Sequence, residues 1–88
     1  MTYKVLLSST AVRQLKKLTK RERDRIVKGL QELREDPLNP RSGADIRALE
    51  GTDPKKHRLR AGPYRIIYAV IGTRVKVIEV FRRGRGYR

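Results

Sequence analysis

The stretch KHRLRAGPYRIIYAVI, residues 56–71, decides the fold of this 88-residue chain. A Gly-Pro pair near its centre is a turn signal between two β-rich runs, so the stretch predicts an antiparallel hairpin. Side chains alternate between the two faces of a strand, which places Lys56, Arg58 and Arg60 on one face. Like charges on one sheet face repel each other and do not help folding, so this face indicates a surface for a polyanion.

Turn signals divide the last third of the chain into an antiparallel meander. Gly62-Pro63 separates the first two strands, and Gly72-Thr73 separates the second from the third. The predicted strands are Lys56–Ala61, Tyr64–Ile71 and Arg74–Phe81.

The N-terminal part of the chain predicts one strand and two amphipathic helices. Tyr3–Leu7 is apolar enough for a short strand, and the Ser-Ser-Thr that follows can cap a helix. Thr19 and Glu22 form a capping-box pattern, so a second helix begins there, and Asp36-Pro37 ends it. Helices joined this closely predict a helical hairpin. Their apolar stripes, expected to face the core, are Ala11, Val12, Leu15 and Leu18, then Ile26, Val27, Leu30 and Leu33.

Residues 38–53 are rich in turn-forming residues and predict a loop, with room for one helical turn at residues 45–49. The element order is then β-α-α-β-β-β, an α+β fold in a single domain, residues 1–88. We expect the helical hairpin to pack on one face of a mainly antiparallel four-stranded sheet. The opposite face stays open and is the expected working surface.

The chain is strongly basic, with 23 Lys and Arg residues against 9 Asp and Glu residues and a formal net charge of +14. This imbalance favours a nucleic-acid partner, an acidic protein partner, or both. The absence of Cys excludes a disulfide framework, and with a single His we expect no metal site and no cofactor. No apolar run approaches the roughly 20 residues of a membrane-spanning helix, and the N-terminus lacks a signal-peptide pattern. We therefore expect a cytoplasmic protein without a membrane partner.

Three segments together resemble the RelE/ParE toxin superfamily of type II toxin–antitoxin systems. They are Leu49-Glu50-Gly51, the run from Lys56 to Tyr68, and Val80-Phe81-Arg82-Arg83 followed by Tyr87. The resemblance spans nearly the whole chain, including the opening strand and the first helix, and it implies a RelE-like fold. Within the superfamily, the RelE branch cuts messenger RNA in the ribosomal A site, whereas the ParE branch poisons DNA gyrase.

The basic strand, the Tyr-Arg pair and the terminal Arg-x-x-x-Tyr are similar to the RelE branch. The resemblance therefore implies a ribosome-dependent mRNA endoribonuclease that acts without a metal, through the 2′-hydroxyl of the message, and leaves a 2′,3′-cyclic phosphate. The residues that match the catalytic positions of the branch are Lys56, Arg58, Arg65, Arg83 and Tyr87. Some RelE enzymes have lysine where Arg58 stands, and arginine is a poor proton carrier at neutral pH.

Four of the matched positions suit one part of RNA cleavage each. A single His excludes a two-histidine mechanism, so Lys56 is the candidate base, because the positive charges around it favour loss of its proton. Arg65 and Arg83 have the planar, permanently charged groups that clamp a phosphate. Tyr87 could stack on a base or orient the reacting hydroxyl. The alternative for the basic positions is electrostatic RNA binding without catalysis.

A second group of basic residues predicts contacts with RNA phosphates outside the matched positions. Neutralisation of phosphates is additive, so the helical members suit docking to ribosomal RNA, although each one alone is also compatible with a solvated helix face. In the strands and tail they are Arg60, Arg82 and Arg85, and in the helices Lys16, Lys17, Lys20, Arg21 and Arg25. We interpret His57, Tyr64 and Tyr68 as structural side chains.

The partners that the resemblance implies are an acidic, RelB-like antitoxin, the small-subunit RNA of the ribosome, and messenger RNA. Two other functions stay open at this point. One is a ParE-like toxin that inhibits gyrase, for which arrested supercoiling with intact messages is the signature. The other is a non-catalytic basic protein that binds RNA or the ribosome and is harmless when expressed without a partner.

Overall fold

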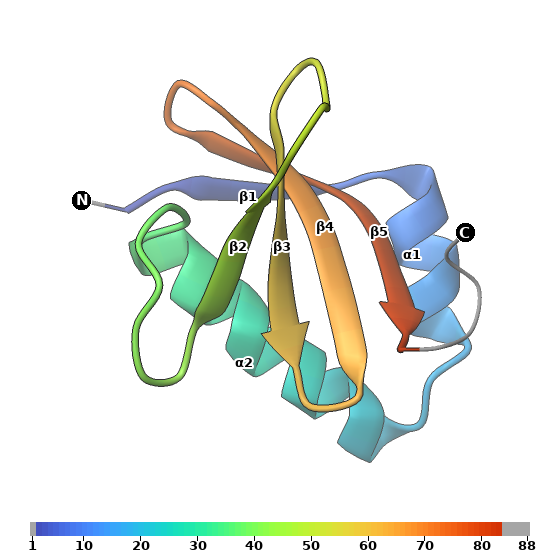
Figure 1. The fold of residues 1–88 in the computed structure, drawn as a ribbon. Coiled ribbons are helices and arrows are strands. Elements are labelled where there is room, and N and C mark those ends of the chain that lie inside the picture. The colour runs from blue at the N-terminus through green and yellow to red at the C-terminus, as the bar shows by residue number, and fades with distance from the viewer. Residues whose placement is uncertain (1, 84–88) are drawn as a thin grey trace.

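A computed structural model describes residues 2–83, which form a five-stranded sheet and two helices (Figure 1). The strand order is β1-β5-β4-β3-β2, with β1 parallel to β5 and the other neighbours antiparallel. Both helices lie on one face of the sheet, α1 against β5 and α2 against β3 and β1. The predicted α+β class is confirmed. The elements are β1 (Lys4–Leu7), α1 (Ser9–Lys16), α2 (Lys20–Glu35), β2 (Asp45–Leu49), β3 (Lys56–Ala61), β4 (Tyr64–Ile71) and β5 (Arg74–Arg82).

The described sheet has five strands, whereas the sequence predicted four. Residues 45–49, expected to be a loop with room for a helical turn, form β2 and pair antiparallel with β3. Ile46 is buried, while Asp45 and Arg47 on either side of it are exposed. This alternation is the signal of a half-buried strand, but a run of five residues beside Pro, Gly and Asn is too short to stand out. The additional strand extends the open face by one row of side chains.

The predicted helix ends are confirmed. The Ser8 hydroxyl caps α1 by accepting a hydrogen bond from the backbone amide three residues later at 3.0 Å. Thr19 and Glu22 form the reciprocal capping box of α2, and Asp36-Pro37 ends the helix. Neither of the two helices in residues 2–83 is long and apolar enough to cross a membrane.

The core lies between the helices and the sheet. Tyr68 is fully buried, and its hydroxyl donates a hydrogen bond to the Pro37 carbonyl at 2.7 Å. His57 stacks on Tyr68 with ring centroids 5.4 Å apart, so it lies on the core side of β3, opposite the basic set, as predicted. Tyr64 is also buried as a packing residue. The other fully buried large side chains include Ile26, Leu33, Leu59, Ile66, Val75 and Val77.

Close packing of α2 on the sheet depends on Gly29. A Cβ atom at this position would lie 2.9 Å from Cδ2 of Leu59, so glycine allows the helix to approach β3. Ile26 is fully buried on the same side of the helix, whereas Val27 is 45% exposed. The predicted core position of Val27 is therefore wrong, because neighbouring residues on a helix point about 100° apart and Ile26 occupies the centre of the buried stripe.

Candidate nucleic-acid interface

The face of the sheet turned away from the helices carries basic residues of β2, β3 and β4. On β3, Leu59 is buried towards the helices, so Arg58 and Arg60 lie on the other face. The strand register places Arg60 directly opposite Arg65 on β4, and Arg58 directly opposite Arg47 on β2. Directly opposed like charges destabilise a sheet by about 0.2–1 kcal/mol for each pair. A bound polyanion would offset this cost.

Arg65 is the most enclosed of these cations, with 8% of its surface exposed. Its Nη1 atom donates hydrogen bonds to two carbonyl oxygens at the β3–β4 turn, at 3.1 and 3.3 Å, which holds the guanidinium in place. Burial lowers the pKa of Arg65 from its ordinary value, and the charges of Arg60, Arg58 and Arg83 lower it further. Arg58, Arg60 and Arg83 therefore lie close enough to act on Arg65 electrostatically. We call Arg58, Arg60, Arg65 and Arg83 the arginine cluster.

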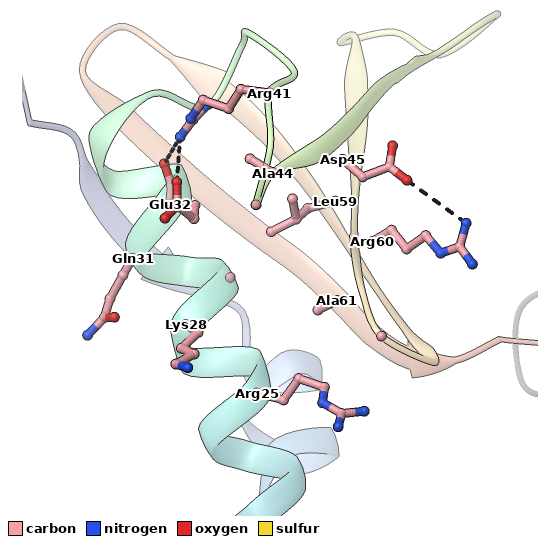
Figure 2. A pocket seen from close by; sticks show the side chains of 13 residues that line it. Arg25, Lys28, Gln31, Glu32, Arg41, Ala44, Asp45, Leu59, Arg60 and Ala61 are labelled. Carbon is pink, nitrogen blue, oxygen red and sulfur yellow. Dashed lines mark hydrogen bonds and ion pairs between the residues drawn. The ribbon is translucent and has the colours of Figure 1, made fainter.

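Asp45, at the start of β2, is an acidic residue that faces the arginine cluster. Its Oδ1 atom is 3.4 Å from Nη2 of Arg58, and its Oδ2 atom is 4.0 Å from Nη1 of Arg60. Figure 2 shows the ion pair between Asp45 and Arg60. Asp45 also opposes the lowering of the pKa of Arg65. Asp45 supplies one negative charge beside the four positive charges of the cluster, which stays positive.

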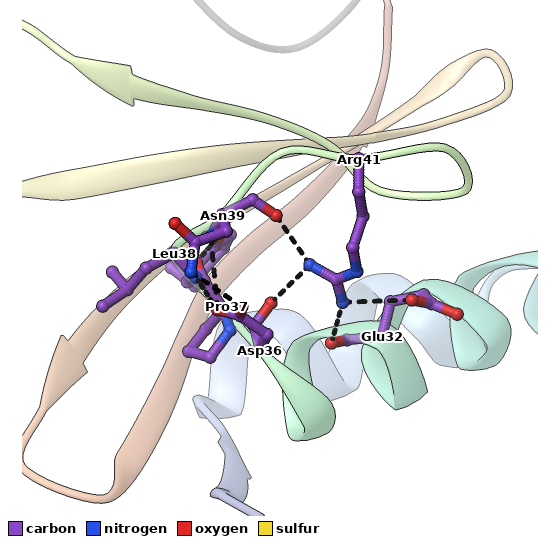
Figure 3. Close-up of polar contacts among 7 residues, drawn as sticks. Glu32, Asp36, Pro37, Leu38, Asn39 and Arg41 are labelled. Atoms are coloured by element: carbon purple, nitrogen blue, oxygen red, sulfur yellow. Dashed lines mark hydrogen bonds and ion pairs between the residues drawn. The ribbon is translucent and has the colours of Figure 1, made fainter. Parts of the chain in front are cut away.

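The side chain of Arg41 ties the loop that leads towards β2 to the end of α2 (Figure 3). Its Nη1 atom donates hydrogen bonds to the carbonyl oxygens of Asp36 at 2.9 Å and Asn39 at 2.7 Å. Its Nη2 atom donates to the carbonyl oxygen of Glu32 at 2.8 Å and to the Oε1 atom of the same residue at 3.0 Å. The start of β2 is thus tied to the end of α2.

Arg83 and Lys56 flank the other members of the site. The Arg83 amide donates a hydrogen bond to the Pro63 carbonyl at 2.6 Å, which holds the end of β5 against the β3–β4 turn. Lys56 is half-buried at the start of β3, and its amide donates to Oγ1 of Thr52 at 2.8 Å. It shares a face with Arg58, two residues along the strand, a spacing of about 6.6 Å. Lys56 therefore borders the arginine cluster.

The family model for the ParE toxin of type II toxin–antitoxin systems matches residues 5–87. This chain belongs to the RelE/ParE toxin superfamily. It is similar to a chain of the archaeal RelE–RelB complex from Pyrococcus horikoshii OT3, with 34% identity, a TM-score of 0.80, and coverage of 98% of this chain and 100% of that chain. It is also similar to the isolated E. coli RelE toxin, with 29% identity and a TM-score of 0.72. That match covers 96% of this chain and 87% of the E. coli chain. A chain of the toxin–antitoxin complex RelBE2 from Mycobacterium tuberculosis has 27% identity and a TM-score of 0.74. That match covers 94% of this chain and 100% of the other chain. No curated protein matches the chain significantly.

Some predicted RNA contacts of this toxin lie outside the arginine cluster. β5 runs one residue beyond its predicted end and includes Arg82, directly opposite Tyr64. The hydroxyl of Tyr64 donates a hydrogen bond to Glu22 of α2, so Arg82 lies on the helix side of the sheet. Two further predicted positions, Arg85 and Tyr87, lie outside the described residues.

The basic residues of the toxin's helices belong to the layer on the other face of the sheet. Arg25 reaches the β3–β4 turn, because a Cβ atom on Gly62 in that turn would lie 2.7 Å from its Nη1 atom. With Lys28 and Arg60 it lines a groove of about 600 Å³ between α2 and β3 (Figure 2). The predicted helical contacts are all exposed: Lys16, Lys17, Lys20, Arg21 and Arg25.

Three residues of the toxin's site were not predicted from the sequence. Arg41, Asp45 and Arg47 lie in or beside the segment expected to be a loop. Asp45 and Arg47 could have been predicted from the alternation of Ile46 and Ala48 with polar neighbours. This pattern places Asp45 and Arg47 on the open face of the sheet.

Proposed function

We propose that this toxin is a ribosome-dependent endoribonuclease that cuts messenger RNA in the A site and so inhibits translation. The arginine cluster carries the proposal. Arg58, Arg60 and Arg65 lie on the uncovered face of the sheet, with Arg60 directly opposite Arg65. The fourth arginine, Arg83, follows β5 and acts on Arg65 electrostatically, and this arrangement suits a ligand with several phosphates. Similarity to RelE toxins of three organisms supports the RelE branch.

The proposed reaction is attack of the message's own 2′-hydroxyl oxygen on the adjacent phosphorus, which breaks the P–O5′ bond. The products are a 2′,3′-cyclic phosphate and a 5′-hydroxyl, whose oxygen takes up a proton from water. Arg65 and Arg83 bind that phosphate and stabilise the charge that develops on it. The guanidinium of Arg65 is already held by the β3–β4 turn, so it needs little reorganisation. Lys56 takes the proton of the hydroxyl, and Tyr87 stacks on a neighbouring base. Such a site depends on exact placement of the substrate, which the ribosome supplies by holding the codon.

We also propose an acidic, RelB-like antitoxin as the protein partner of this toxin in the cytoplasm. The relative from Pyrococcus horikoshii forms a complex with RelB, and a net charge of +14 suits an acidic partner. The exposed basic residues of α1 and α2 would contact small-subunit ribosomal RNA. Since phosphate contacts release counterions, this docking should weaken steeply as salt is raised.

A reconstituted translation system with one defined message tests the nuclease proposal. The wild-type toxin should produce new 5′ ends within codons, and only while ribosomes translate the message. Arg65→Ala, Arg83→Ala and Lys56→Ala should each slow cleavage by about 10²-fold or more. Lys4→Ala, which removes an exposed positive charge from β1 at the opposite edge of the sheet, is the matched control and should cut normally. Wild-type cleavage by all three site variants would overturn the assignment.

Gyrase inhibition is the second candidate, because the family model that matches the chain describes ParE. A toxin of that kind would stop supercoiling by purified gyrase and leave messages intact. A non-catalytic RNA-binding protein would instead bind RNA without any cut product. The same translation reaction, run beside a supercoiling assay, separates the three functions.

A further inference from the structure

Asp45 occupies a position between two arginines where an external anion would also bind. Its carboxylate spans Arg58 and Arg60, with N···O distances of 3.4 and 4.0 Å. Charge-assisted hydrogen bonds between such groups normally measure about 2.7–2.9 Å, so both contacts are loose. The Asp45 side chain is also 55% exposed, and exposed ion pairs contribute little. The carboxylate is therefore held weakly.

Arg58 has a hydrogen-bond donor that Asp45 does not use. Its Nε atom is buried and has no acceptor within residues 2–83. Nε and Nη2 form one edge of the guanidinium plane, on which a carboxylate or phosphate can bind through two parallel hydrogen bonds. Asp45 contacts Nη2 alone. A buried donor without an acceptor costs free energy, and an oxyanion placed across the whole edge would remove that cost.

The charges around this edge favour an anion that can move into it. Arg58 lies directly opposite Arg47, and Arg60 directly opposite Arg65, so two repulsive pairs converge where Asp45 supplies one negative charge. The backbone of Asp45 is fixed by its pairing with β3, which limits how far its short side chain can follow the arginines. A phosphodiester offers two charged oxygens and no such tether.

We propose that Arg58 and Arg60 form a phosphate subsite in which Asp45 is a displaceable internal counter-ion. A phosphate of the bound RNA replaces the Asp45 carboxylate, accepts hydrogen bonds from both Nε and Nη2 of Arg58, and contacts Arg60. This phosphate is a neighbour of the scissile one, which Arg65 and Arg83 hold. The subsite rests on the proposed function for its ligand, RNA, and does not depend on cleavage.

Binding of a non-cleavable RNA tests the subsite. The probe is a fluorescently labelled single-stranded oligonucleotide with 2′-O-methyl riboses, and its affinity is measured by anisotropy over a range of salt concentrations. Asp45→Asn should bind the probe about 3–10-fold more tightly than wild type, because the competing carboxylate is gone. Glu50→Gln removes the same charge from an exposed turn residue and should change affinity less than about 2-fold. The gain should disappear when Asp45→Asn is combined with Arg58→Lys, which lacks the two-donor edge.

Three outcomes would overturn the subsite. Equal gains for Asp45→Asn and Glu50→Gln would show that net charge alone explains the effect. Weaker binding by Asp45→Asn would show that the carboxylate positions the arginines for the ligand and does not compete with it. A gain for a poly-glutamate peptide without a gain for the RNA probe would assign the position to an acidic protein.

A measurement on the wild-type protein covers the case in which Asp45→Asn does not fold. The NMR signal of the Arg58 Nε–H group should shift when inorganic phosphate is added, and an unchanged signal would overturn the subsite.

The binding and cleavage results together separate this inference from the proposed nuclease activity. If Asp45→Asn binds the RNA probe more tightly but the wild-type toxin does not cut messages, the subsite is supported and the nuclease proposal is refuted. If the wild-type toxin cuts messages but Asp45→Asn binds no more tightly, the subsite alone is refuted.

Discussion

Replacing Arg47 by glutamine should stabilise this toxin while weakening its binding to RNA. Arg47 is exposed on β2 and lies directly opposite Arg58 on β3. Two like charges in this register repel each other, and the net charge of +14 adds to the repulsion. Glutamine has a similar length and removes the charge, so the strand pairing is kept while the repulsion is lost.

The size of the effect follows from the geometry. Coulomb's law gives about 0.6 kcal/mol for two unit charges roughly 7 Å apart in a medium of dielectric constant about 80. Asp45 lies 3.4 Å from Arg58 and offsets part of the repulsion. We therefore expect Arg47→Gln to raise the free energy of unfolding by about 0.5 kcal/mol, within the range for opposed charges in sheets. For a domain of this size, that corresponds to a rise in melting temperature of about 2–4 °C.

Thermal unfolding followed by circular dichroism measures this gain. It should be present in about 0.01 M salt and vanish in about 1 M salt, where the Debye length falls from roughly 30 Å to about 3 Å. Lys28→Gln is the matched control, because it removes the same charge from an exposed position on α2, where no arginine lies directly opposite it across a pair of strands. Equal stability of the two variants, or a gain for Arg47→Gln that persists in high salt, would refute the reasoning. When the logarithm of the RNA-binding constant is plotted against the logarithm of the salt concentration, Arg47→Gln should make the slope shallower by about 0.7. This change corresponds to the loss of one phosphate contact on single-stranded RNA.

Other predictions concern the core, the cap of α2 and the single histidine. Ile26→Ala should lower the free energy of unfolding in urea by about 3 kcal/mol, because the side chain is fully buried. Val27→Ala, on the exposed flank of the same helix, should cost less than about 1 kcal/mol, and equal losses would contradict the packing of α2. Thr19→Ala should cost about 1 kcal/mol and speed amide exchange in the first turn of α2. Burial, and then the charge of Lys55, lower the pKa of His57. As the pH is lowered, His57 therefore takes up its proton in the unfolded chain before it does so in the folded protein. The contribution of neutral His57 to the free energy of unfolding should be complete above about pH 6.5 and decline below it. His57→Phe should remove that decline.

Much of the fold could be predicted because local signals agree with the packing. The strands Lys56–Ala61 and Tyr64–Ile71 have the predicted bounds, since Gly62 adopts a positive φ of 61° at the turn between them. β2 could not be predicted in the same way. Its short run of residues is stabilised as a strand by pairing with β3 across the loop of residues 50–55, and the composition of the segment does not reveal this pairing.

The site could be predicted only in part for the same reason. Arg58, Arg65 and Arg83 were expected from the family resemblance, and the fold brings them together. Asp45 and Arg47 enter the site through the register between β2 and β3, which cannot be read from either strand alone.

Mapping the 5′ ends of cellular messages after brief expression of the toxin tests the central claim most directly. The wild-type protein should generate new 5′ ends at A-site positions within translated frames, and Arg65→Ala, expressed to the same level and folded, should generate almost none. Intact messages together with arrested DNA supercoiling would contradict the claim and assign the toxin to the gyrase-inhibiting branch.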